Sequence, residues 1–379
     1  YHVVSHRTIQ AAIHSKIDPY IITYEQSKID NRKLANRYFT VKSIINPLFH
    51  TSFLPSIFWS MNDFLVSLKL SSQINFVDFD VIHILNINKE AYLLTQLFSR
   101  INKPILLHLF HSQYVLNDDV FKMRKIVFKL KFYSNFSNHT LTSNFSMYNF
   151  LLDKYGFDEN RVHYVPIPVD TRKFKTMQKE NVRKKYGVQE NIPIVAYIGS
   201  LNPSRGLFYL IKSFLNVVET CPDSKLFISH LKRKGEESYE LFLHQLVKKY
   251  CISDNVIIRG PSQYVEEIYN LADVVALPFT RPYWVDPPLV LLEAMSCGGA
   301  VISTSVGAIN EIIKDDENGI MINPRDTSSL SNAIIKLFSS PQRIKRYGNN
   351  ANKTIREKHA YKIVGKKLLD IYEKVQENQ

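Results

Sequence analysis

The chain has 379 residues, with 48 lysines and arginines against 35 aspartates and glutamates, which gives a formal net charge of +13. Hydrophobic residues make up 45% and charged residues 22%, a composition that is typical of packed globular proteins and excludes a disordered chain. The length predicts two domains, and the positive charge favours anionic partners.

The first half of the chain alternates short apolar runs with amphipathic stretches, the pattern of successive βα units. Helices are predicted at Arg7–Lys16, Ile57–Leu70, Glu90–Ile101 and Phe145–Tyr155, the last of them ending at Gly156. Strands are predicted at Pro19–Tyr24, Phe79–Ile84, Pro104–Leu109, His139–Thr142 and Val162–Val165.

One segment of this half, Phe121–Tyr133, carries five cations and no acidic residue, and its apolar residues roughly follow a helical period. A basic amphipathic helix can lie on an anionic membrane surface, or it can pack one face on its own domain. No run of 18 apolar residues occurs, so we expect no membrane-spanning helix. Three cysteines without a CxxC pair exclude a disulfide framework and predict a reducing compartment. The sequence thus predicts a cytoplasmic protein, with peripheral attachment to the inner face of the cell membrane as a further hypothesis.

The second half repeats the βα alternation after a polar, lysine-rich stretch. We predict an N-terminal domain at 1–172, a linker at 173–191, a C-terminal domain at 192–358 and a helix at 359–379 that packs back toward the N-terminal domain. This predicts an α/β protein of two doubly wound, Rossmann-like domains that face a cleft. The strands of the second series are predicted at Ile194–Ile198, Lys225–Ser229, Asn255–Ile258, Val274–Leu277 and Ala300–Ser303, and its helices at Leu207–Val218, Ser238–Tyr250, Gln263–Asn270 and Leu289–Cys297.

Two polar clusters in the second domain follow predicted strands. The loop from Gly199 to Gly206 leads from a strand into a helix and carries Arg205, so it could bind an anion; an ordinary turn with a solvated arginine fits equally well. Glu293 lies inside an apolar helix and needs a partner, because an unpaired buried charge is costly. A pair of sugar hydroxyls would satisfy this carboxylate, and so would a neighbouring backbone group or arginine.

These clusters, followed by Gly307, Glu311 and Asn318-Gly319, resemble the group 1 glycosyltransferases (GT4), which have the GT-B fold. The resemblance is specific over Ile194–Phe338, where Leu289–Gly298 matches the family's LV-x-LEAM-x-x-G core, and it is weaker in the first half. It implies a retaining transfer of a sugar from a nucleotide sugar, UDP- or GDP-linked, to a glycan or lipid-linked acceptor. No cofactor, metal or specific nucleic acid is implied.

The resemblance also implies roles for single residues. Glu293 would bind the nucleotide ribose, while main-chain N–H groups at the start of its helix would hold the diphosphate. Arg205 would stabilise the leaving diphosphate, because negative charge grows there as the glycosidic bond breaks. We expect His111, rather than His108, to face the donor sugar. The catalytic residues implied are His111, Arg205 and Asp286, and the donor-binding residues are Gly199, Ser200, Arg205, Arg259, Gly260, Asp286, Pro288, Leu289, Val290 and Glu293.

Three departures from the family pattern keep other functions open. Val285 stands where the family has its first motif glutamate, so Asp286 is expected to replace that carboxylate. Ser200 stands where a cation is usual. The predicted helix Arg7–Lys16 lies close to the start of the given sequence, so we expect the family's first strand and glycine-rich loop to be missing or to precede Tyr1. A catalytically degraded homologue that acts as an anion-binding or scaffolding protein is the alternative, and a phosphorylase is a third reading.

Overall fold

The computed structural model describes residues 2–15, 21–23, 38–40, 80–85, 104–110, 139–231, 236–282 and 286–377. The chain divides into two compact units. Unit 1 comprises Tyr1–Pro168 and Tyr361–Gln379, and unit 2 comprises Val169–Ala360. The predicted helices Ile57–Leu70 and Glu90–Ile101 and the basic segment 121–133 lie outside the described residues.

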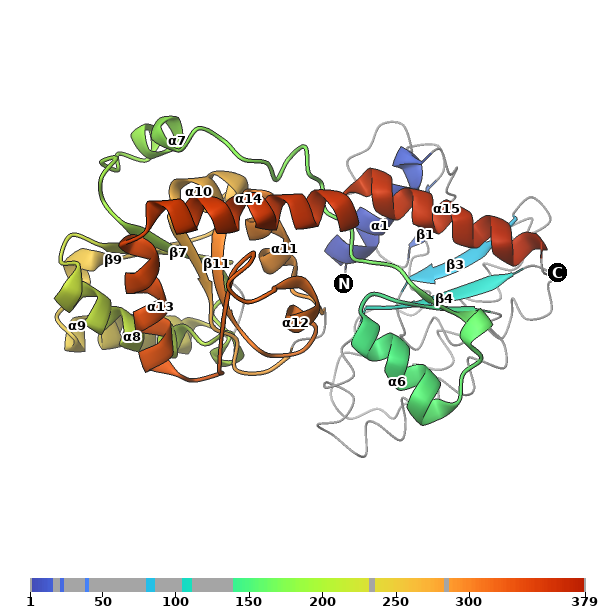
Figure 1. Ribbon diagram of the computed structural model, residues 1–379, viewed down its shortest axis with the longest axis horizontal. Helices are drawn as coiled ribbons and strands as arrows, with labels where there is room; N and C mark the ends of the chain where they lie inside the picture. Colours follow the sequence, from blue (N-terminus) through green and yellow to red (C-terminus); the bar gives the residue numbers. More distant parts are fainter. Residues whose placement is uncertain are drawn as a thin grey trace, which may run out of the picture. The chain divides into compact units, whose positions relative to one another are not determined.

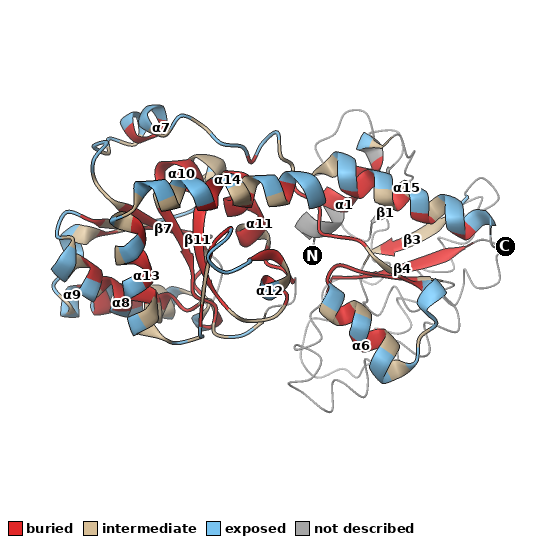
Figure 2. Cartoon of the chain, in the orientation of Figure 1, coloured by how far each residue is buried: buried red, intermediate tan, exposed pale blue. Residues whose placement is uncertain are grey.

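Unit 2 is built on a parallel sheet that has six strands within the described residues, in the order β12-β11-β10-β7-β8-β9. The central strands are buried on both faces, which Figure 2 shows for β7 and β11, and their near-continuous apolar runs are typical of parallel sheets. The strands are β7 (Ile194–Ser200), β8 (Lys225–Leu231), β9 (Val256–Arg259), β10 (Val274–Leu277), β11 (Ala300–Thr304) and β12 (Ile320–Ile322).

Helices cover both faces of this sheet (Figure 1). One face carries α8 (Leu207–Thr220), α9 (Glu237–Lys249) and α13 (Thr327–Phe338), and the other carries α10 (Val265–Leu271), α11 (Leu289–Ser296) and α14 (Pro341–Lys358). The apolar faces of α8 and α13 pack on the strands in one continuous core that includes Phe214, Ile334 and Leu337. The short helix α12 (Ile309–Ile312) follows β11.

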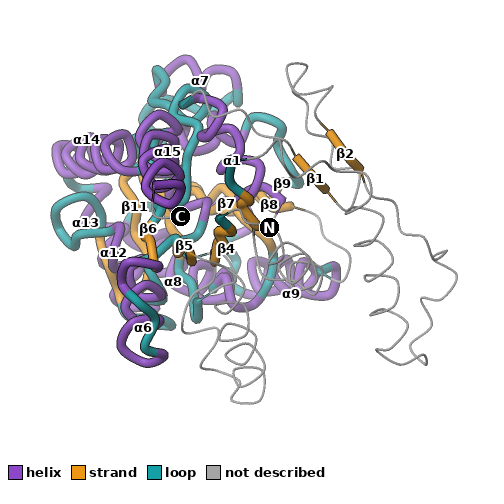
Figure 3. Tube along the Cα trace, turned by 90° about the vertical axis from the view of Figure 1, so that its right-hand side faces the viewer, coloured by secondary structure: helices purple, strands orange, loops and turns teal. Residues whose placement is uncertain are grey.

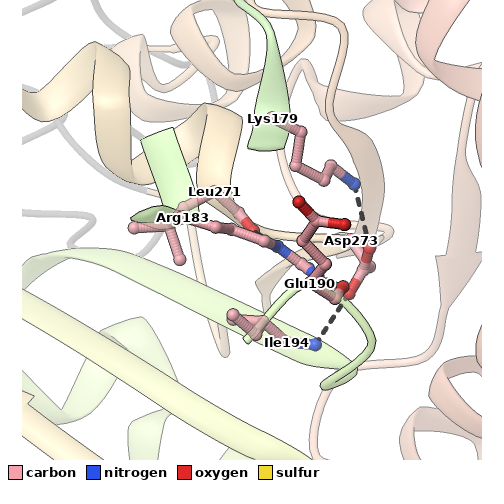
Figure 4. Close-up of polar contacts among 6 residues, drawn as sticks. All are labelled: Lys179, Arg183, Glu190, Ile194, Leu271 and Asp273. Atoms are coloured by element: carbon pink, nitrogen blue, oxygen red, sulfur yellow. Dashed lines mark hydrogen bonds and ion pairs between the residues drawn. The ribbon is translucent and has the colours of Figure 1, made fainter. Parts of the chain in front are cut away.

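The segment 173–191, predicted to be a linker, is part of unit 2 in the structure and contains the helix α7 (Lys179–Lys185). Arg183, which is 3% exposed, holds this helix against the sheet (Figure 4). Its guanidinium donates to Asp273 Oδ2 at 2.7 Å, to the carbonyl of Leu271 at 3.0 Å and to the carbonyl of Glu190. Asp273 also accepts from Lys179 at 2.9 Å and from the N–H of Ile194 at 2.8 Å, so one carboxylate joins α7 to the start of β7. The polar composition predicted a linker, and in the structure several of its charged side chains make specific tertiary bonds.

Unit 1 contains a second parallel sheet, with the described strands in the order β3-β4-β5-β6, and a described pair, β1 and β2, that is also parallel. The helices α1 and α15 lie side by side (Figures 1 and 3), so closely that a side chain at Gly365 would meet the carbonyl of Ala11. The elements are α1 (His2–His14), β1 (Ile21–Thr23), β2 (Tyr38–Thr40), β3 (Ile82–Leu85), β4 (Ile105–Leu109), β5 (His139–Thr142), α6 (Phe145–Tyr155), β6 (Val162–Tyr164) and α15 (Tyr361–Glu377).

Candidate functional site

The loop between β7 and α8 is held against the end of the neighbouring strand β10. Gly206 has a left-handed backbone (φ 78°), and a Cβ atom there would lie 1.7 Å from the carbonyl oxygen of Pro278, so only glycine fits. The N–H of Thr280 donates to the carbonyl of Ser204 at 2.9 Å. The Arg205 guanidinium lies over the Phe279 ring at 5.2 Å from its centre. Arg205 is therefore fixed at the carboxyl ends of two adjacent strands.

The start of α11 lies after β10, at the same edge of the sheet. Pro288 is the N-cap residue, and no side chain caps the helix. The first backbone bond inside the helix runs from the N–H of Leu291 to the carbonyl of Pro288 at 3.1 Å, so the N–H groups of Leu289 and Val290 precede it. These N–H groups, at the positive end of the helix dipole, form a surface that can bind an anion.

Glu293 lies one turn into α11 and is 8% exposed. The hydroxyl of Tyr269, from α10, donates to Glu293 Oε2 at 3.0 Å and thereby orients the carboxylate. Burial, and secondly the charge of Glu293, raise the pKa of the Cys297 thiol, which makes that cysteine a poor nucleophile. Sequence reasoning missed Tyr269, because nothing in the pattern of an apolar helix indicates where a tyrosine hydroxyl points.

Asp286 is buried, and its carboxylate bonds to the backbone. Its Oδ2 accepts from the N–H of Ala308 at 2.8 Å. Gly307 (φ 57°) lies against this carboxylate, and a Cβ atom there would lie 2.4 Å from Asp286 Oδ2. We expected Asp286 to contact donor hydroxyls in place of a motif glutamate; in the structure one of its oxygens ties the loop before α11 to the turn after β11.

The other predicted residues are more scattered. Ser200 is buried at the end of β7, beside Gly199 in the same strand. Arg259 and Gly260 are exposed at the end of β9, two strands from β7, and the Arg259 guanidinium lies 5.7 Å from the centre of the Phe227 ring. The remaining two positions of interest, His111 and Val285, lie outside the described residues.

His108, which we did not expect to face the donor sugar, is fully buried in β4, where its Nε2 is hydrogen-bonded to Ser143 Oγ at 3.1 Å. Among the described residues, no group of three or more histidine, cysteine, aspartate or glutamate side chains could hold a metal ion. The helices of the described ranges include none that is long and apolar enough to cross a membrane.

Comparison with known proteins identifies the part of the chain that contains this site. Residues 178–354 match the family model for "Glycosyl transferases group 1". The chain carries a group 1 glycosyltransferase domain. This domain includes Arg205, Asp286 and Glu293, and the resemblance predicted from their motifs is confirmed.

Relatives of this glycosyltransferase domain occur in distant organisms. The chain is 28% identical over 198 residues to an uncharacterized glycosyltransferase of Methanocaldococcus jannaschii, a match that covers 52% of this chain and 48% of that protein. It is 27% identical over 189 residues to the N-acetyl-alpha-D-glucosaminyl L-malate synthase of Bacillus anthracis, over 50% of this chain and 47% of that protein. The chain thus spans about half the length of the curated relatives that it matches.

The fold extends over both units. The crystal structure of Anabaena Alr3699/HepE in complex with UDP matches with a TM-score of 0.79 at 16% sequence identity, over 97% of this chain and 96% of that one. The glycosyltransferase domain and unit 1 therefore have the GT-B architecture of two Rossmann-like units, as predicted from the sequence.

Proposed function

We propose that the chain is a retaining, GT4-type hexosyltransferase that moves a sugar from a nucleotide sugar to a glycan or lipid-linked acceptor. The start of α11 is the observation that carries this proposal. No side chain caps the first N–H groups of this helix. The same helix carries the buried Glu293, whose carboxylate is oriented by Tyr269. Arg205 adds a cation on a loop that is bonded to the segment leading into this helix.

The donor would bind along these groups. The diphosphate would lie at the start of α11, because N–H groups and the helix dipole favour anions there. The Glu293 carboxylate, which Tyr269 orients, would accept hydrogen bonds from the ribose hydroxyls. The Anabaena protein of similar fold is bound to UDP, which supports a UDP-sugar, and a GDP-sugar is the second choice.

The chemistry would be electrostatic. The bond between the anomeric carbon and the phosphate oxygen breaks, and the nucleoside diphosphate leaves with the electron pair. The acceptor oxygen bonds to the anomeric carbon on the same face of the sugar, and its proton passes to the leaving diphosphate. Arg205 and the α11 N–H groups would stabilise the charge of the leaving group. Asp286 would position the loop before α11, and His111 would face the donor sugar, as the resemblance implies. No cofactor or metal is part of this proposal.

The acceptor and its location are inferred from charge. A net charge of +13, with five cations in 121–133, supports an encounter with an anionic membrane surface that presents a lipid-linked acceptor. We propose a cytoplasmic, peripheral association with the inner face of the membrane. Binding to vesicles with and without anionic lipid tests this part, and equal binding to both would contradict it.

The activity is tested by measuring nucleoside diphosphate release from a panel of UDP-, GDP- and ADP-sugars. We expect turnover with one base, and a loss of roughly 100-fold or more in kcat/KM for Glu293→Ala, because a charged partner of the ribose is removed. Glu357→Ala, which removes an exposed glutamate of α14, is the matched control and should retain activity. Lack of turnover and of nucleotide binding across the panel would contradict the proposal.

A second candidate is a catalytically degraded GT-B homologue that binds anions or serves as a scaffold. Val285 and Ser200 favour it, because a carboxylate and a cation of the family pattern are missing there. Nucleotide binding without turnover in the same panel would indicate this function.

A further inference from the structure

Unit 2 has a pocket of about 600 Å³ that includes none of the residues proposed to hold the donor. It lies beside the β7–α8 loop and is bounded by α8, α9, the loop after β10 and the turn after β12. Its volume falls in the range of roughly 300–1,000 Å³ that is usual for small-molecule sites.

One side of the pocket is aromatic. Phe208 from α8 and Tyr239 and Phe242 from α9 line it. The Phe242 ring is stacked with that of Phe208 at 6.2 Å and with that of Tyr239 at 5.8 Å, so the three form a continuous wall. Phe242 is 40% exposed, which leaves ring surface for a ligand.

Three further lining residues, Asn202, Arg281 and Arg325, present hydrogen-bond donors. Arg281 follows β10 and Arg325 follows β12; both are exposed, and neither has an ion pair within the described ranges. Asn202 accepts from the N–H and the hydroxyl of Ser204 through its amide oxygen, so its NH₂ group is the part available to a ligand. No carboxylate lines the described part of the pocket. Two uncompensated guanidinium groups favour a ligand with a negative charge.

We propose that this aromatic–arginine pocket, defined by Asn202, Phe208, Tyr239, Phe242, Arg281 and Arg325, binds an anionic sugar. The ring would lie on the aromatic wall, its hydroxyls would bond to Asn202, and a carboxylate or phosphate would be held by the two arginines. This goes beyond the proposed transferase activity, since the site would bind a ligand without a nucleotide. Its Asn202 lies on the loop that carries Arg205, so the two sites are neighbours along the chain.

The test is binding of glucuronic acid and of glucose 6-phosphate to the full chain, measured by calorimetry and by saturation-transfer NMR. These two probes distinguish a carboxylate from a phosphate as the anionic group. Glucose provides the ring without the charge, and inorganic phosphate the charge without the ring. We expect at least one anionic sugar to bind at least tenfold more tightly than either control.

Three variants assign the binding to this pocket. Arg281→Gln with Arg325→Gln should lower the affinity roughly 100-fold, at about tenfold per charged hydrogen bond lost, and Phe242→Ala should lower it severalfold. Arg356→Gln, an exposed arginine of α14, should leave it unchanged. Unchanged affinity in the double arginine variant would overturn the proposal, as would equal binding of inorganic phosphate.

Titration with UDP separates this site from the donor site. UDP should not displace the anionic sugar, and the double arginine variant should bind UDP as the unsubstituted chain does. If UDP competes and its binding is lost in this variant, the pocket belongs to the donor site and the proposal of a separate sugar site is wrong. Absence of binding by UDP, GDP and ADP alike would contradict the proposed transferase, and the binding of the anionic sugar would still be measured independently.

Discussion

The two units differ in the polar side chains that they bury. Unit 2 buries charged groups that have specific partners, such as Arg183 with Asp273, and Glu293 with Tyr269. The sheet of unit 1 contains two stacked histidines: His108 is fully buried, and the half-buried His83 is hydrogen-bonded to Tyr372 at 2.5 Å and stacks on His108 at 5.3 Å. Burial lowers the pKa of His83 to about 3, so this ring is neutral at pH 7. Unit 2 thus holds buried charged groups on specific partners, although it also buries His230 and His359, whereas the stacked histidines of unit 1 depend on staying uncharged.

The largest effect is expected when the charged network of unit 2 is broken. Arg183→Met should destabilise this unit by about 2–4 kcal/mol, because Asp273 loses one of its two cations and the carbonyls of Leu271 and Glu190 lose a buried donor. Urea unfolding combined with hydrogen exchange in α7 and β7 would measure this. Lys185→Ala, which breaks the exposed pair with Glu267, is the control and should leave the unfolding midpoint nearly unchanged. An unchanged midpoint in Arg183→Met would mean that 173–191 is a loose linker after all.

Lowering the pH should destabilise unit 1. The pKa of His83 is lowered in the folded state, so below pH 6.5 the unfolded chain binds a proton at His83 that the folded chain does not bind. The free energy of unfolding therefore decreases as the pH is lowered. Between pH 6.5 and pH 4 the loss from His83 should reach about 2–3 kcal/mol. His83→Phe should flatten this slope in urea unfolding experiments, whereas Tyr372→Phe should preserve it, because burial is the cause of the shift. A slope that is the same with and without His83 would contradict the comparison.

A smaller effect is expected at the turn that holds Asp286. Gly307→Ala should cost about 1–2 kcal/mol for the left-handed backbone alone and should displace the carboxylate. Gly260→Ala is the matched control in unit 2, since no atom lies within 4 Å of a Cβ there. Thermal unfolding of both variants tests this prediction, and equal midpoints would show that the contact of Gly307 with Asp286 carries no strain.

The smallest effect concerns a helix cap in unit 1. The Asn144 side chain accepts from the N–H of Met147 at 2.7 Å, at the start of α6. Asn144→Ala should cost about 1 kcal/mol, whereas Asn144→Asp retains the acceptor and should cost less. Hydrogen exchange in α6 would resolve the two. Equal protection in both variants would argue that packing, and not the cap, fixes the start of this helix.

Local signals were sufficient for much of the fold. The predicted bounds of His139–Thr142, Phe145–Tyr155 and Val274–Leu277 agree with β5, α6 and β10. In α6 the reason is visible, because Asn144 caps its start and Gly156 ends it in the left-handed conformation. The edge strand β12 and the helix α7 were not predicted, because they are short and their positions depend on tertiary contacts.

The candidate site divides in the same way. Arg205 after β7 and the start of α11 after β10 could each be placed at a strand end from sequence, because the position of a residue within its own strand–helix unit is a local property. The partners of the two carboxylates could not. Tyr269 is 24 positions from Glu293, and Ala308 is 22 positions from Asp286, so each pair is formed only when separate elements of the fold pack together.

The measurement that tests the central claim most directly is calorimetric titration of UDP into the unsubstituted chain and into Glu293→Ala. If the start of α11 holds the diphosphate and Glu293 the ribose, UDP should bind, and the substitution should weaken binding by roughly 10- to 100-fold. Equal affinity for both proteins would contradict the account, as would the absence of binding by UDP, GDP and ADP alike.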